Sequence, residues 1–245
     1  MCAERQSISI SGSGHLGGGE YVRVSISGSG RVDGDLVAEE LRISGSGKVA
    51  GRTEAGQITI SGSGRFGGAV RAEEMRVSGS AKVDGPVEAK ELKSSGSFHA
   101  DGDVAAEYFK NSGSFRVRGD VEADLFKASG GFDIEGLLSA DKIEIQLGGR
   151  CAAREIGGET IRVERPGSLG SALLGGLAKM LTGGGMAELR ATQIEADEVH
   201  LENTVSDVVR GKRVEIGPGC RIGTVEYTET LKVHEDAKVE RPQKV

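Results

Sequence analysis

The sequence repeats itself every 17 residues. The motif Ile-Ser-Gly-Ser-Gly begins at Ile43 and again at Ile60, and the close variant Val-Ser-Gly-Ser-Ala begins at Val77. Only the first step, of 16 residues from Ile10 to Ile26, departs from this period. Further turns begin at Ser94, Asn111, Ala128 and Ile145. A fixed period of this kind is typical of solenoids, in which each repeat buries its apolar face against its neighbours.

Within each repeat, apolar or small residues alternate with polar ones. We number the places of the repeat from 1, the Ile of the motif, to 17; apolar or small residues occupy places 1, 3, 5, 7, 11, 13 and 16. A period of two indicates β-strands. Glycine at place 9, as in Gly34 and Gly51, predicts a corner with positive φ. The charged pair at places 14 and 15, as in Glu39 and Glu40, predicts a second corner.

Strands this short cannot bury a core alone, so the turns must stack as parallel strands about 4.8 Å apart. The pattern therefore predicts an all-β fold, a three-sided parallel β-helix with 17-residue turns. A sheet with βα crossovers is excluded because no helical segment lies between the strands. The composition agrees, because 40 glycines and no Trp leave few large side chains for a thick globular core.

All six Phe residues fall at places that we predict to face inward. Phe66 is at place 7. The three turns with Phe at place 5 have Ser94, Asn111 or Ala128 at place 1 instead of Ile or Val, so one large group replaces another within the same cross-section. We expect a core aromatic column made of Phe98, Phe115, Phe132, Phe109 and Phe126.

The repeat is interrupted once. It covers residues 7–165, breaks over 166–187, and resumes over 188–240. From Val163 to Leu201 there are 38 residues, one turn of 17 plus an insertion of 21. The insertion is predicted to form a short amphipathic helix, about 21 Å long and too short to span a bilayer. It would either pack on the β-helix or contact a membrane or partner. Its apolar stripe is Leu169, Leu173, Leu174, Leu177 and Leu181.

Charge and cysteine usage argue against several classes of function. The net charge is −6, with acidic and basic residues interspersed and no basic stripe beside aromatic residues, so we expect no nucleic-acid partner. Cys2, Cys151 and Cys220 form no CxxC pair, and their odd number fits a reducing compartment. Neither a signal peptide nor a membrane span is predicted, which favours a cytoplasmic protein.

No constellation of catalytic or metal-binding residues stands out. The four histidines, at 15, 99, 200 and 234, face outward and lie far apart. We therefore expect neither an enzyme nor a bound metal or cofactor. A β-helix enzyme would need a cleft built by several long loops, and this chain has one insertion.

Exposed serines offer an alternative function. Pairs such as Ser44 with Ser46 and Ser61 with Ser63 would form two parallel ladders along the outside. Such ladders could bind a polysaccharide or an ice surface in a β-helix that does not polymerise. Ser lacks the branching that fixes Thr rotamers, so small polar filling of the exterior is the simpler interpretation.

The ends of a β-helix expose unpaired backbone groups, and the sequence predicts no capping helix at either end. Such an end is a template for another copy, and end-on stacking yields filaments. We place the N-terminal contact on Ile8, Ile10 and Leu16, and the C-terminal contact on Val233, Ala237 and Val239. The C-terminal end is the more charged and is predicted to be the weaker one. Alternatively, charges at both tips keep the chain monomeric.

The repeats, together with EIGGETIRVERP and VEIGPGCRIGTVEYTET, resemble the bactofilins, a bacterial polymer-forming cytoskeletal family, over about residues 7–235. The resemblance implies a right-handed β-helix that polymerises end to end without nucleotide, often at the inner membrane, as a scaffold for envelope, shape or motility machinery. The implied partners are further copies of the chain, a paralogue and, peripherally, the membrane. Many bactofilins have about half as many turns, and the insertion at 166–187 is extra relative to them.

Overall fold

The computed structural model describes residues 6–165 and 187–245. The chain divides into two compact units, Met1–Asp124 and Leu125–Val245, which we call unit 1 and unit 2. All regular secondary structure in the described residues is β-strand. The helix predicted within 166–187, with Leu169, Leu173, Leu174, Leu177 and Leu181, lies outside the described residues.

Unit 1 is a stack of parallel strands. Its strands are β1 (Gln6–Ile10), β2 (Ser13–Ile26), β3 (Ser29–Ile43), β4 (Ser46–Val49), β5 (Thr53–Ile60), β6 (Ser63–Phe66), β7 (Val70–Val77), β8 (Ser80–Val83), β9 (Val87–Ser94), β10 (Ser97–Ala100), β11 (Val104–Asn111) and β12 (Ser114–Val117); β13 (Val121–Ala128) contains the boundary between the units. From β4 to β13, four-residue strands at places 4–7 alternate with eight-residue strands from place 11 to place 1 of the next turn.

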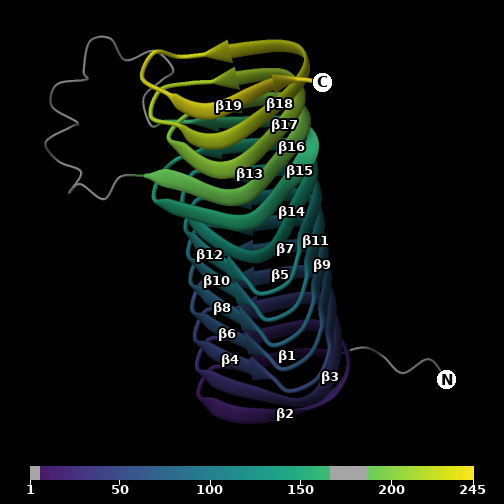
Figure 1. Cartoon of the computed structure of the whole chain (residues 1–245). Coiled ribbons are helices and arrows are strands. Elements are labelled where there is room, and N and C mark those ends of the chain that lie inside the picture. Colours follow the sequence, from purple (N-terminus) through teal and green to yellow (C-terminus); the bar gives the residue numbers. More distant parts are fainter. Residues whose placement is uncertain (1–5, 166–186) are drawn as a thin grey trace, which may run out of the picture. The chain divides into compact units, whose positions relative to one another are not determined.

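Stacked strands of unit 1 keep the register that the repeat predicts. Ser46 lies opposite Ser63, and Ser63 lies opposite Ser80, each 17 residues further along the chain. Figure 1 shows β4, β6, β8, β10 and β12 above one another on one side of this unit. The predicted parallel β-helix with 17-residue turns is therefore confirmed.

The corner at place 9 is present, but the predicted positive φ is wrong for most of its glycines. Only Gly34 has one, with φ 117°. A Cβ on Gly51 would lie 2.6 Å from the carbonyl carbon of Gly34, and a Cβ on Gly102 would lie 2.7 Å from the nitrogen of Pro86. Glycine is therefore required here because the preceding turn approaches too closely for a side chain.

A further corner, at places 2 and 3, was not predicted. The chain bends at each Ser-Gly pair, so place 3 is half-buried and does not belong to the core. A Cβ on Gly45 would lie 2.1 Å from the carbonyl oxygen of Gly28, and a Cβ on Gly113 would lie 2.0 Å from that of Gly96. At places 14 and 15 the strand runs on while two successive side chains, such as Glu73 and Glu74, face away from the core.

Unit 2 is also a parallel stack, with longer strands and a less regular repeat. Its strands are β14 (Gly131–Gln146), β15 (Arg150–Glu164), β16 (Glu188–Leu201), β17 (Thr204–Ile216), β18 (Arg221–Val233) and β19 (Lys238–Lys244). Val163 pairs with Leu201, Leu201 with Ile216, and Ile216 with Val233. The 38-residue step from Val163 to Leu201 is thus a single turn that carries the insertion, as predicted.

The core contains every Phe residue, as the repeat predicts. In unit 1 the Phe115 ring lies 6.3 Å from that of Phe98 and 4.8 Å from that of Phe109, and in unit 2 the Phe126 and Phe132 rings are 5.8 Å apart. Each of these five side chains is at most 3% exposed. The predicted exchange between places 1 and 5 is also present. Asn111 stands at place 1 of a turn with Phe at place 5, and it is fully buried, with its amide in contact with the backbone of Gly113.

Candidate assembly surfaces

The N-terminal strand edge of unit 1 is open within the described residues. β1 pairs with β2 through Ile8 opposite Val24 and Ile10 opposite Ile26, and residues 13–20 of β2 pair with β3. The amide of Ser27 donates to the carbonyl oxygen of Ile10 at 2.9 Å, so the polar groups of Ile10 face β2. Because successive residues of a strand point their backbone groups to opposite sides, those of Ser9 face the open edge.

This edge carries almost no charge. Between Gln6 and Gly19 there is no Asp, Glu, Lys or Arg. His15 is the one ionisable side chain in this stretch, and it lies 3.6 Å from Asp33 of the next turn. Ile10 is 9% exposed, while Ile8 and Leu16 are half-buried. The three residues predicted for the N-terminal contact thus lie on the two strands that form this edge.

The C-terminal strand edge of unit 2 differs in the backbone groups that it presents. β19 pairs with β18 through Arg221 opposite Lys238 and Val225 opposite Pro242, and no other described strand pairs with it. The amide of Val245 donates to the carbonyl oxygen of Tyr227 at 3.0 Å. Because backbone groups alternate sides along a strand, the nitrogen of Pro242, three residues before Val245, faces the open edge. Proline has no N–H to donate there.

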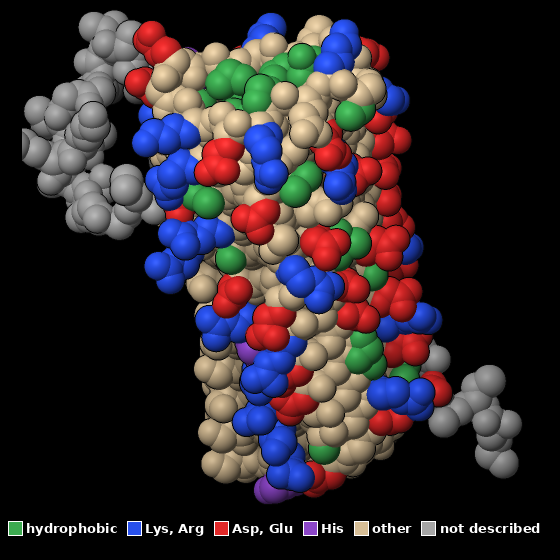
Figure 2. Space-filling model, viewed as in Figure 1, with side chains coloured by type: hydrophobic (Ala, Val, Ile, Leu, Met, Phe, Trp, Pro, Cys, Tyr) green, Lys and Arg blue, Asp and Glu red, His purple; other side chains and the backbone are tan. Residues whose placement is uncertain are grey.

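Side chains at this end are mostly charged. Lys238, Glu240, Arg241 and Lys244 of β19 are all exposed. Of the predicted contact residues, Val233 is 45% exposed, and Ala237 and Val239 are half-buried. Figure 2 shows hydrophobic side chains at this end of unit 2 framed by Lys and Arg. The two edges therefore differ in both backbone donors and charge.

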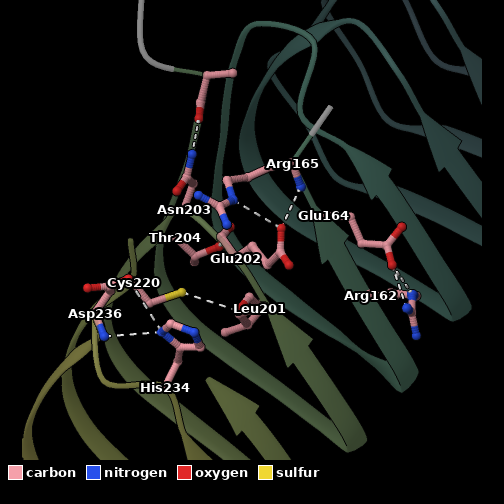
Figure 3. Close-up of polar contacts among 11 residues, drawn as sticks. Arg162, Glu164, Arg165, Leu201, Glu202, Asn203, Thr204, Cys220, His234 and Asp236 are labelled. Carbon is pink, nitrogen blue, oxygen red and sulfur yellow. Dashed lines mark hydrogen bonds and ion pairs between the residues drawn. The ribbon is translucent and has the colours of Figure 1, made fainter. Parts of the chain in front are cut away.

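Both ends of the insertion are fixed by neighbouring residues of unit 2 (Figure 3). The amide of Arg165 donates to the Glu202 carboxylate at 2.9 Å, and the Arg165 guanidinium lies 3.3 Å from the same oxygen. The side-chain amide of Asn203 donates to the carbonyl oxygen of Ala187 at 3.4 Å. The chain therefore leaves and re-enters the β-helix at a defined point beside β16.

The cysteines and histidines of the described residues form no reactive group. Burial raises the pKa of the Cys151 and Cys220 thiols to about 11, so both stay protonated. His99 contacts Asp101 at 2.9 Å, and His200 contacts Glu215 at 3.5 Å. In the part of the chain that the structure describes, no three His, Cys, Asp or Glu side chains come together as a metal site.

A row of basic side chains, which we name the basic ladder, follows place 6 along unit 1. The sequence carries the signal for this row, since the same place is basic in seven successive turns. Figure 2 shows the row as a continuous line of Lys and Arg beside an area without charged side chains. The serines at places 2 and 4 of these turns, such as Ser44 and Ser46, are exposed. The ladder consists of His15, Arg31, Lys48, Arg65, Lys82, His99 and Arg116.

A groove runs along the long strands of unit 1, and we name it the alanine groove. Its floor is the alanine at place 13 of six successive turns, each 5–8% exposed. Its walls come from places 12 and 14, where most side chains are acidic. The groove has a volume of about 640 Å³. Its floor residues are Ala38, Ala55, Ala72, Ala89, Ala106 and Ala123.

Comparison with known proteins gives matches to individual proteins and to one family model. Two Bacillus subtilis (strain 168) proteins are similar over short stretches: Uncharacterized protein YhbF is 50% identical over 74 residues, and Uncharacterized protein YhbE is 44% identical over 57. These stretches are 30% and 23% of this chain and only 26% and 24% of the two relatives. No solved structure matches.

Within the described residues, no helix is long and apolar enough to cross a bilayer. Residues 5–105, which lie in unit 1, match the family model described as Bactofilin, polymer-forming cytoskeletal. This segment includes the open edge of β1 and β2 and most of the basic ladder. The resemblance to bactofilins is therefore confirmed over residues 5–105, and the family that this segment matches is one of polymer-forming cytoskeletal proteins.

Proposed function

We propose that this protein is the subunit of a cytoskeletal polymer that assembles end to end, without nucleotide, through the open strand edges. The observation that carries the proposal is the uncharged edge of β1 and β2, whose outward backbone groups have no partner strand in the described residues. It lies within the segment that matches the bactofilin model.

An edge strand of this kind pairs readily with another chain. Proteins that stay monomeric protect such edges with charges, proline or a covering element. The N-terminal edge lacks charges over residues 6–14, and half-buried Ile8 adds apolar surface. End-on contacts of this type do not close, so they extend into filaments. The driving force is backbone pairing and apolar burial, which requires no nucleotide hydrolysis.

We infer that the two ends contribute unequally. At the C-terminal edge, Pro242 removes one outward donor and the charged residues of β19 must be desolvated or paired on contact. Val233, Ala237 and Val239 supply the apolar part of this weaker contact. A paralogue with the same repeat would present the same backbone pattern and could enter the polymer.

The wider role that we propose is at the inner face of the cytoplasmic membrane, where the polymer would recruit envelope, shape or motility machinery. Support comes from the family resemblance and from the insertion, whose ends are fixed to unit 2 by Glu202 and Asn203. Cell fractionation of the Leu173→Glu, Leu177→Glu double variant tests the membrane contact. The expected result is a shift of the protein out of the membrane fraction, and an unchanged distribution would contradict it.

Sedimentation of the purified full chain without nucleotide tests polymerisation. The expected result is a pellet that grows with protein concentration and contains filaments in negative-stain micrographs. A monomer at every concentration would contradict the proposal. It would favour the alternative, a β-helix that binds a polysaccharide or ice surface through its exposed serine ladders.

A further inference from the structure

The alanine groove of unit 1 carries an excess of negative charge. Of its charged lining residues, six are carboxylates and two are basic. Arg71 is bound to Glu88 at 2.7 Å. Lys90 is bound to Glu73 at 2.9 Å. The other four carboxylates are exposed and form no ion pair within the described residues, and we name them the groove carboxylates: Glu54, Glu107, Glu122 and Asp124.

Carboxylates at place 8 of the same unit show the contrast. Asp84 lies 3.5 Å from the Arg65 guanidinium, and Asp101 lies 3.1 Å from the Lys82 amine. The chain therefore supplies cations to the row at place 8 and supplies none to the groove carboxylates. A cationic ligand that enters the groove would meet four carboxylates without displacing a partner from any of them.

The positions of the groove carboxylates exclude a single small cation as the occupant. Glu54 and Glu107 belong to turns three apart, which is about 14 Å along the stack at a strand spacing of about 4.8 Å. Asp124 follows Glu107 at place 14 of the next turn, and Glu122 stands on the opposite wall at place 12. No three acidic, His or Cys side chains of residues 6–165 and 187–245 come together as a metal site. The occupant must therefore be a chain that carries several cations.

The shape of the groove fits an extended chain. Its floor runs over six turns, from Ala38 to Ala123, which is about 24 Å. A groove with a volume of about 640 Å³ over that length is too narrow for an α-helix, which is about 10–12 Å across with its side chains. About seven residues of extended chain cover the same length. The small floor residues leave room for the aliphatic stems of Lys and Arg side chains, whose charged heads reach the walls.

The segments of this chain outside the described residues do not supply the missing cations. Their only basic residues are Arg5 and Lys179. Two cations on separate segments cannot match four carboxylates of one groove. The complementary charge must therefore come from another molecule.

We propose that the alanine groove binds an extended Lys- and Arg-rich segment of a partner protein, whose basic heads pair with the groove carboxylates. The proposal names the chemistry of the partner that the scaffold recruits, and it rests on the recruitment in the proposed function. One exposed ion pair contributes little, so the affinity comes from several pairs along the groove. The groove and the strand edges are separate surfaces, so binding requires no polymer.

The test measures binding of a fluorescent octapeptide of alternating Lys and Ala to the full chain, by anisotropy at about 50 mM salt. The groove variant carries Glu107→Gln, Glu122→Gln and Asp124→Asn, three exposed positions where the fold is expected to be unaffected. It is expected to bind the peptide about 10-fold more weakly than the parent, because three exposed ion pairs are lost. An octapeptide of alternating Glu and Ala is expected not to bind.

The control variant removes the same number of negative charges at place 8. It carries Asp33→Asn, Asp84→Asn and Asp101→Asn, which lie beside the basic ladder. It is expected to bind the Lys-Ala peptide as tightly as the parent. Equal loss of binding in the two variants would overturn the proposal, because it would show attraction to the net charge of the protein instead of docking in the groove.

Carbodiimide cross-linking, which joins a lysine amine to a carboxylate, locates the bound peptide. Mass spectrometry is expected to find the cross-links on the groove carboxylates, and cross-links confined to other carboxylates would contradict the proposal. Spermine covers the other occupant. Displacement of the peptide by spermine at an equal concentration of amines would make a polyamine the ligand and would also contradict a protein partner.

Pelleting of the same proteins separates this proposal from polymerisation. Both variants are expected to pellet as the parent does, because neither changes a strand edge. A chain that pellets but does not bind the peptide would count against the groove alone. A chain that binds the peptide but stays monomeric at every concentration would count against end-on assembly alone.

Discussion

The two open edges of the molecule are built from the same kind of strand and are protected very differently. The N-terminal edge, β1 and the first half of β2, has no Asp, Glu, Lys or Arg between Gln6 and Gly19. The C-terminal edge, β19, is exposed at every residue except half-buried Val239 and places Pro242 where a backbone donor would face outward. A β-helix needs protection at any end that stays free in solution, so the unprotected end is the one to expect in a contact.

This difference indicates a division of tasks between the ends. Pairing at the N-terminal edge would supply most of the binding energy, whereas the C-terminal edge would limit how readily chains extend. The comparison depends on backbone chemistry at particular residues, so single substitutions can break or sharpen it.

The largest effect that we expect is on the free energy of unfolding, and it leaves the difference between the two strand edges unchanged. Phe115→Ala removes a fully buried ring that contacts Phe98 and Phe109, and we expect the free energy of unfolding to fall by about 3–5 kcal/mol. Denaturant unfolding measures this loss. The folded variant should pellet at the wild-type concentration because both edges are unchanged. Loss of assembly in the folded variant would mean that the edges do not control it.

Ser9→Pro should have the largest effect on assembly itself. It removes an outward donor from the N-terminal edge while the bond between Ile10 and Ser27 remains. A lost backbone partner costs about 1–3 kcal/mol, which corresponds to a rise of about 5- to 150-fold in the concentration needed for pelleting. Ser9→Ala is the matched control and should pellet as wild type. Equal behaviour of the two variants would exclude this edge from the contact.

Pro242→Thr should have a smaller effect of the opposite sign. The substitution restores an outward N–H at the C-terminal edge, and one hydrogen bond contributes about 0.5–1.5 kcal/mol, or about 2- to 10-fold in affinity. Filament length in micrographs is the measurement, and it should increase. Gln243→Thr serves as the control, since the amide of residue 243 faces β18. Longer filaments in the control alone would contradict the assignment of edges.

Salt should have the smallest effect on the end-on contact. Because the N-terminal edge lacks charged side chains, raising salt from about 50 to 500 mM should change the pelleting concentration less than about 3-fold. Filament mass should therefore persist at the higher salt concentration. Dissolution of single filaments by salt would show that charged groups dominate the end contact.

Much of this fold follows from the sequence, because the 17-residue period sets both strand pairing and core. The pairing of Val163 with Leu201 across the insertion could be predicted from periodicity alone. The Ser-Gly corner could not, since a half-buried glycine fits strand alternation as well as a bend. What requires glycine there is the carbonyl oxygen of the preceding turn, as Gly45 against Gly28 illustrates, and this distance appears only in three dimensions.

The candidate surfaces were predicted in part. The sequence placed Ile8, Ile10 and Leu16 near one end and identified the C-terminal turn as the more charged. It did not reveal which way each backbone amide points, so the roles of Ser9 and Pro242 required the strand register. The basic ladder could have been recognised at place 6. The alanine groove could not, because alanine at an inward place looks like ordinary core until the bend beside it is known.

Hydrogen–deuterium exchange during assembly tests the central claim most directly. Backbone amides of residues 6–19 and of residues 238–244 are compared between dilute protein and pelleted filaments. We predict that residues 6–19 become strongly protected in the filament, and more so than residues 238–244. Rapid exchange of residues 6–19 in fully assembled protein would contradict the account, because it would leave the uncharged edge without a partner strand.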